Sequence, residues 1–109
     1  MAELRNRGEW PALVPTVVLV EALSGDHRRD YHQNRLLRTC DIRTVHEDLA
    51  RQAAALRAQV KARRIPSAVD AILVAVADQA GGGTVLSSDV SDLRALARHT
   101  RNPVMVEPV

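Results

Sequence analysis

The chain has 109 residues, with 15 Lys and Arg against 13 Asp and Glu and a formal net charge of +2. This length fits one domain, since domains most often have about 100–150 residues. No apolar run reaches the ~18 residues that a membrane helix needs, and the start MAELRNRGEW has no apolar signal segment. We therefore expect one domain spanning residues 1–109 in the cytoplasm, with no membrane partner.

The cysteine, histidine and aromatic content of the chain limits the kinds of site and core that it can form. The single Cys40 excludes an intramolecular disulfide, and the four histidines show no zinc-ligand spacing. Trp10 and Tyr31 are the only aromatic residues, so the core must consist of aliphatic side chains. The small positive charge is compatible with nucleic acid but does not require it.

The first half of the chain alternates short apolar segments with a basic one. Gly and Pro mark the ends of the helices, and the apolar run TVVLVEALSG contains one acid, Glu21. The basic segment carries Arg28, Arg29 and Arg35. In chain order the pattern predicts a helix end at 2–8, a strand at 10–14, a helix at 16–25, an amphipathic helix at 26–38 and a strand at 42–45.

The second half continues the alternation. An apolar stripe at helical spacing is formed by Leu49, Ala53, Leu56 and Val60. The pattern predicts helices at 46–64, 67–80 and 89–100 and strands at 84–87 and 104–106. Alternating helices and short apolar strands are typical of an α/β fold, with a short parallel sheet between helices.

Several acids occupy positions where a carboxylate needs an explanation. Asp70 falls inside the apolar run AVDAILVAVA, and Glu21 repeats this arrangement in the first half. Asp89 and Asp92 follow directly after a predicted strand, where sites form in parallel sheets. Burying an unpaired carboxylate costs several kcal/mol, and oxygen ligands suit Mg²⁺ or Mn²⁺. The pattern therefore predicts a divalent-metal site.

Each acid also has an ordinary explanation. Asp89 could cap the helix that follows it, Asp70 or Glu21 could pair with an arginine, and Asp92 could be exposed. Three hypotheses are therefore open: a metal-dependent enzyme, a non-catalytic interaction module, and a small α/β domain whose buried acids only form ion pairs.

Several motifs, in the same order, resemble PIN-domain ribonucleases of the VapC toxin type. They are VPTVVLVEALSG, the basic segment around Asn34 to Leu37, PSAVDAILVAVA, TVLSSDVSDLRALA and the closing VMVEPV. The resemblance covers about residues 11–109. It implies a PIN-like three-layer fold, Mg²⁺- or Mn²⁺-dependent endoribonuclease activity, an RNA substrate and a VapB-like antitoxin as partner.

The resemblance also assigns roles to individual residues. It implies that Glu21, Asp70 and Asp89 are catalytic and bind the metal, with Asp92 as an accessory metal ligand. Ser87 stands at the hydroxyl position of the family's strand-end motif. Three arginines are candidates for RNA contact: Arg28, Arg29 and Arg35.

The chain departs from the family at its start. The family begins with a central strand that ends in a metal-binding aspartate, and no equivalent precedes residue 11, so we expect an N-terminally truncated PIN-like domain. Three accounts fit, in this order: a start assigned too late, a degraded gene, or a fragment that takes a strand from a partner. The alternative function is a non-catalytic remnant that binds an antitoxin-like partner, and a homodimer is also a candidate.

Overall fold

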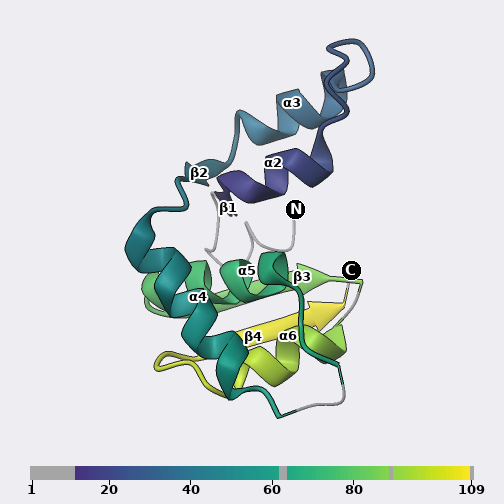
Figure 1. Cartoon of the computed structure of the whole chain (residues 1–109). Coiled ribbons are helices and arrows are strands. Elements are labelled where there is room, and N and C mark those ends of the chain that lie inside the picture. Colours follow the sequence, from purple (N-terminus) through teal and green to yellow (C-terminus); the bar gives the residue numbers. More distant parts are fainter. Residues whose placement is uncertain (1–11, 62–63, 89, 109) are drawn as a thin grey trace. The chain divides into compact units, whose positions relative to one another are not determined.

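A computed structural model describes residues 12–61, 64–88 and 90–108 (Figure 1). The chain divides into two units, Met1–Thr44 and Val45–Val109, which we call the first and the second unit. In the described ranges, no helix is long and apolar enough to cross a bilayer.

The first unit contains two short strands and two short helices. Strand β1 (Leu13–Pro15) leads directly into α2 (Thr16–Ala22), and α3 (Tyr31–Leu37) is followed by β2 (Asp41–Arg43). The strands β1 and β2 pair in parallel, with Val14 opposite Ile42. Neither helix contributes a buried side chain.

The second unit contains three longer helices and a second strand pair. Its elements are α4 (Glu47–Gln59), α5 (Ala68–Gln79), β3 (Gly83–Ser87), α6 (Val90–Ala97) and β4 (Val104–Pro108). The strands β3 and β4 run parallel, with Val85 opposite Val106, so that β3, α6 and β4 form one crossover unit. Helix α4 packs against α5, and both α5 and α6 contact the strands.

These elements confirm the predicted α/β class and the parallel pairing, with boundaries shifted by a few residues. In the described part of the chain, the strands form two separate pairs, β1 with β2 and β3 with β4. Helix α2 ends at Ala22, before the predicted stop at Gly25, and α3 covers only the later part of the basic segment. The predicted helix end at 2–8 lies outside the described residues.

The core of the second unit is aliphatic. All buried Leu, Val and Ala residues in the described ranges belong to this unit, and Leu93, Leu96 and Val74 are fully buried. The predicted stripe of α4 is confirmed for Leu49, Ala53 and Leu56, which are buried. Val60 is only half-buried, because α4 ends one residue before it.

The turn before β3 and the loop before β4 approach each other closely at the start of this strand pair. Gly82, in the turn between α5 and β3, has a positive φ of 108°, and a Cβ there would lie 2.5 Å from the Pro103 carbonyl oxygen. That oxygen accepts a hydrogen bond from the Gly83 backbone N–H at 3.0 Å. A side chain at position 82 would therefore separate the beginnings of β3 and β4.

We expect Gly82→Ala to destabilise the protein by about 2–3 kcal/mol, because it combines backbone strain with a clash against backbone. Gly81→Ala is the matched control, since Gly81 has a positive φ of 93° but nothing within 4 Å of an added Cβ. Urea unfolding followed by far-UV circular dichroism measures both. Equal losses of stability in the two variants would contradict the close approach.

Candidate functional site

The beginning of α5 and the end of β3 lie at the same end of the second unit. Only residues 80–82 separate α5 from β3, and the two elements run in opposite directions (Figure 1). Asp70 in the first turn of α5, Ser87 at the end of β3 and Asp92 in the first turn of α6 therefore share this end, which we call the acidic end. It is also the carboxyl end of the parallel strands.

Asp70 is the third residue of α5, in the capped first turn of this helix. Ser67 is the N-cap of α5, and its hydroxyl oxygen accepts a hydrogen bond from the Asp70 backbone N–H at 3.1 Å. The sequence pattern suggests an acid in the helix interior, whereas the structure places Asp70 in the first turn and half-buried. A carboxylate there gains about 0.3–1 kcal/mol from the helix dipole. Its position alone no longer calls for a metal.

The other predicted ligands are distributed over the chain. Ser87 and Asp92 are half-buried at the acidic end, and Asp89, between them in sequence, lies outside the described residues. Glu21 belongs to α2 of the first unit and is exposed. Across the described ranges, no group of three His, Cys, Asp or Glu side chains is arranged to hold a metal ion.

The three arginines proposed for RNA contact are exposed and belong to the first unit. Arg35 lies over the ring of Tyr31, with its guanidinium carbon 5.9 Å from the ring centroid. Arg28 follows a turn in which its backbone N–H donates to the Asp26 carboxylate at 2.9 Å. The structure thus leaves these side chains accessible to solvent.

The first unit contains a buried acid that the sequence pattern does not single out. The Asp30 carboxylate accepts hydrogen bonds from the backbone N–H and the hydroxyl of Ser24, both at 2.9 Å to Oδ1, and from the Gly25 backbone N–H at 3.0 Å. The Ser24 backbone N–H is the main reason that the pKa of Asp30 lies below its ordinary value, although burial acts in the opposite direction. Asp30 thereby holds the loop between α2 and α3.

This lowered pKa predicts a pH-dependent contribution to stability. The ionised Asp30 stabilises the fold above its unfolded pKa of about 4, and this contribution is lost as the pH falls through the lower folded value. We expect Asp30→Asn to be clearly less stable than the parent chain at pH 7, with the difference shrinking below about pH 5. Denaturant titrations at several pH values measure it.

Ser24→Ala provides a graded comparison, because it removes the hydroxyl donor and keeps both backbone donors to Asp30. Its effect should be smaller and follow the same pH trend. A stability difference between Asp30→Asn and the parent chain that stays constant from pH 7 to pH 3 would contradict the assignment.

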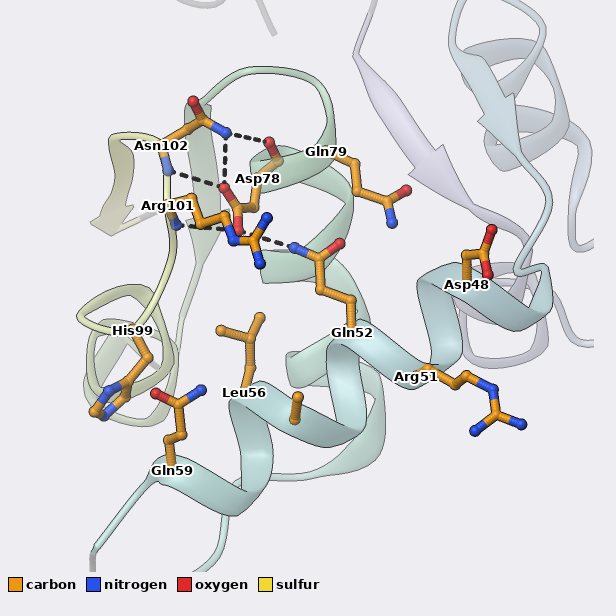
Figure 2. Close-up of a pocket in the computed structure, with 11 residues that line it drawn as sticks. Asp48, Arg51, Gln52, Leu56, Gln59, Asp78, Gln79, His99, Arg101 and Asn102 are labelled. Atoms are coloured by element: carbon orange, nitrogen blue, oxygen red, sulfur yellow. Dashed lines mark hydrogen bonds between the residues drawn. The ribbon is translucent and has the colours of Figure 1, made fainter.

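The second unit also contains a buried acid, Asp78, near the end of α5 (Figure 2). Its carboxylate accepts hydrogen bonds from the Gln52 side-chain amide at 2.9 Å and from the Asn102 backbone N–H at 2.9 Å. The Asn102 side-chain amide at 3.0 Å and the Arg101 backbone N–H at 3.3 Å complete the set. These bonds connect α5 to α4 and to the loop between α6 and β4.

An open pocket of about 800 Å³ surrounds this cluster, at the opposite end of α5 from the acidic end. Its walls come from one face of α4, the end of α5 and the loop before β4 (Figure 2). The pocket is lined by Asp48, Arg51, Gln52, Ala55, Leu56, Gln59, Asp78, Gln79, His99, Arg101 and Asn102. We call it the Asp78 pocket.

Sequence reasoning missed Asp78 although it belongs to the same apolar helix as Asp70. A local signal existed, since Asp78 is the second acid in the run AVDAILVAVADQ. Its partners, however, lie 26 residues before it and 23 or 24 residues after it. Only the folded chain shows that the more deeply buried of the two acids is Asp78.

We expect Asp78→Ala to lower the free energy of unfolding by about 2–4 kcal/mol, because it leaves several donors in a part-buried site without an acceptor. Asp48→Ala is the matched control, since Asp48 is an exposed carboxylate on the rim of the same pocket. Its effect should stay within about 0.5 kcal/mol. Equal effects of the two substitutions, measured by chemical denaturation, would refute the role of Asp78.

In comparisons with protein-family models, curated protein sequences and solved structures, nothing matches this chain.

Proposed function

We propose that the chain is a metal-dependent endoribonuclease of the PIN type, a toxin that hydrolyses RNA phosphodiesters and is neutralised by a VapB-like antitoxin. One observation carries the proposal: Asp70, Ser87 and Asp92 share the carboxyl end of a parallel strand pair. Sites in parallel α/β proteins form at this end of the strands. The PIN resemblance of the sequence supplies the choice of reaction.

The donors at the acidic end fit Mg²⁺ or Mn²⁺ in chemical type. Two carboxylates and a hydroxyl are oxygen donors, and Mg²⁺ commonly binds one or two carboxylates together with water and phosphate oxygens. Such a metal, when bound, offsets charge on the phosphate and lowers the pKa of a coordinated water.

In the proposed nuclease, each of these residues has a separate role. Asp70 and Asp92 hold the metal, and Ser87 orients a ligand or a water molecule. Asp89 completes the ligand set in the proposal. The exposed Arg28, Arg29 and Arg35 attract the RNA phosphates.

A second function, binding of an antitoxin-like partner without catalysis, has an observation in its favour. In the first unit, large apolar side chains are exposed: Val20 is 79% exposed, Tyr31 55% and Leu36 45%. Val20 belongs to α2, and Tyr31 and Leu36 belong to α3. Exposed apolar side chains that form one contiguous patch are typical of protein contact surfaces. In this alternative, the chain keeps its partner and lacks the nuclease activity.

The metal is tested first, because binding does not require turnover. Saturating Mg²⁺ or Mn²⁺ should raise the melting temperature of the parent chain, since a ligand that binds only the folded state stabilises it. Asp70→Asn and Asp92→Asn should abolish this rise. Asp48→Asn is the matched control, because Asp48 is also a first-turn carboxylate but belongs to α4.

Cleavage of RNA is then measured with each metal. Asp70→Asn and Asp89→Asn should lower the rate by at least about tenfold, whereas Asp48→Asn should leave it unchanged. Equal cleavage by all variants would refute the assignment. An absence of both cleavage and metal-dependent stabilisation, with retained capture of a co-expressed neighbouring small protein, would favour the second function.

A further inference from the structure

The Asp78 pocket lies at the end of the second unit that the proposed nuclease does not use. Its loop wall is held in place, because the buried Asp78 carboxylate binds the backbone N–H groups of both Arg101 and Asn102. Asn102 adds a side-chain hydrogen bond to the Asp78 carbonyl oxygen at 2.9 Å. The positions from which the Arg101 side chain and its neighbours project are thus fixed before any ligand arrives, which lowers the entropic cost of binding.

The loop wall presents cationic and hydrogen-bonding groups. Arg101 and His99 line the pocket and are exposed, and no ion pair or hydrogen bond to either side chain occurs within the described ranges. In contrast, the lining Arg51 is already paired with Glu47 at 2.7 Å and points away from the other lining side chains (Figure 2). Among the lining side chains in the described ranges, the Arg101 guanidinium therefore carries a positive charge that is not in an ion pair, while the lining also includes the carboxylates of Asp48 and Asp78.

The opposite wall presents an amide, an aliphatic and a second amide side chain. Gln52, Leu56 and Gln59 lie at positions i, i+4 and i+7 of α4, which places them on one helix face. Gln52 uses one amide hydrogen for Asp78, while its carbonyl oxygen and second hydrogen remain available. Amide groups form paired donor and acceptor contacts with the edges of bases, and an aliphatic side chain accepts the face of a ring.

We propose that the Asp78 pocket binds a nucleotide, with Arg101 holding the phosphate and the α4 row of Gln52, Leu56 and Gln59 holding the base. The volume of about 800 Å³ lies within the range of about 300–1,000 Å³ that is typical of small-ligand sites. A guanidinium binds phosphate through two parallel hydrogen bonds. The site is independent of the proposed metal site and would exist in a chain without nuclease activity.

The test is binding in the presence of EDTA, so that no divalent metal contributes. Adenosine, cytidine, guanosine and uridine monophosphates, inorganic phosphate and a short single-stranded RNA are titrated separately, with calorimetry and amide chemical-shift changes as readouts. We expect saturable binding of at least one nucleotide, weaker binding of inorganic phosphate, and shifts near Arg101 and Gln59 rather than near Asp70. If RNA binds more tightly than any monophosphate, the ligand is a nucleotide within an RNA strand. If RNA and a monophosphate bind equally tightly, the ligand is a free nucleotide.

Arg101→Gln should weaken nucleotide and phosphate binding by about tenfold. Arg98→Gln is the matched control, because Arg98 is exposed, belongs to the same loop and does not line the pocket. Gln59→Leu should weaken nucleotide binding and leave phosphate binding unchanged. The proposal is overturned if none of the nucleotides or the RNA binds saturably, or if the Arg101 and Arg98 variants bind equally well.

Discussion

The buried carboxylate of Asp78 is the interaction on which the second unit most depends. It joins α4, α5 and the loop before β4 through four hydrogen bonds to neutral donors. A carboxylate can be buried in this way only if its oxygens remain satisfied, so the three segments must keep their relative positions together. The aliphatic core supplies most of the apolar burial, whereas this cluster specifies how the loop lies.

Because Asp78 is used in these internal hydrogen bonds, the two ends of the second unit carry different kinds of side chain. At the acidic end, Asp70 and Asp92 occupy the first turns of α5 and α6, at the carboxyl end of the strands. At the other end the carboxylate is used internally, and the groups left over are an arginine, a histidine and amides. Our two proposals accordingly assign ligands of opposite charge to the two ends, a cation to one and a phosphate to the other.

Local patterns in the sequence predicted the type and order of most elements and the buried face of α4. They also contained the capping sequence from Ser67 to Asp70, which the apolar run around Asp70 obscured. The sequence could not show that Asp78 and Asp30 are the buried acids, since this depends on the hydrogen-bond donors that contact their carboxylates in the folded chain. For Asp78 those donors come from 23 to 26 residues away.

The candidate metal site was only partly predictable for a related reason. Strand ends and helix starts can be located from hydrophobic periodicity, which places Ser87 at a strand end and Asp92 near a helix start, whereas the role of Ser87 is implied by the resemblance alone. Whether carboxylates from different elements converge depends on helix rotation and on packing between elements, neither of which the periodicity encodes. The pairing of the strands into two separate pairs is a fact of the same kind.

The aliphatic core has a further consequence, for spectroscopy. Both residues with useful fluorescence, Trp10 and Tyr31, come before residue 45 in the sequence, and residues 45–109 contain no Phe, Tyr or Trp. Intrinsic fluorescence therefore arises outside the second unit, with Tyr31 on α3 of the first unit, while far-UV circular dichroism is dominated by the longer helices of the second. Because two probes of one cooperative transition must coincide, comparing these signals in a single titration reveals whether the two units unfold together.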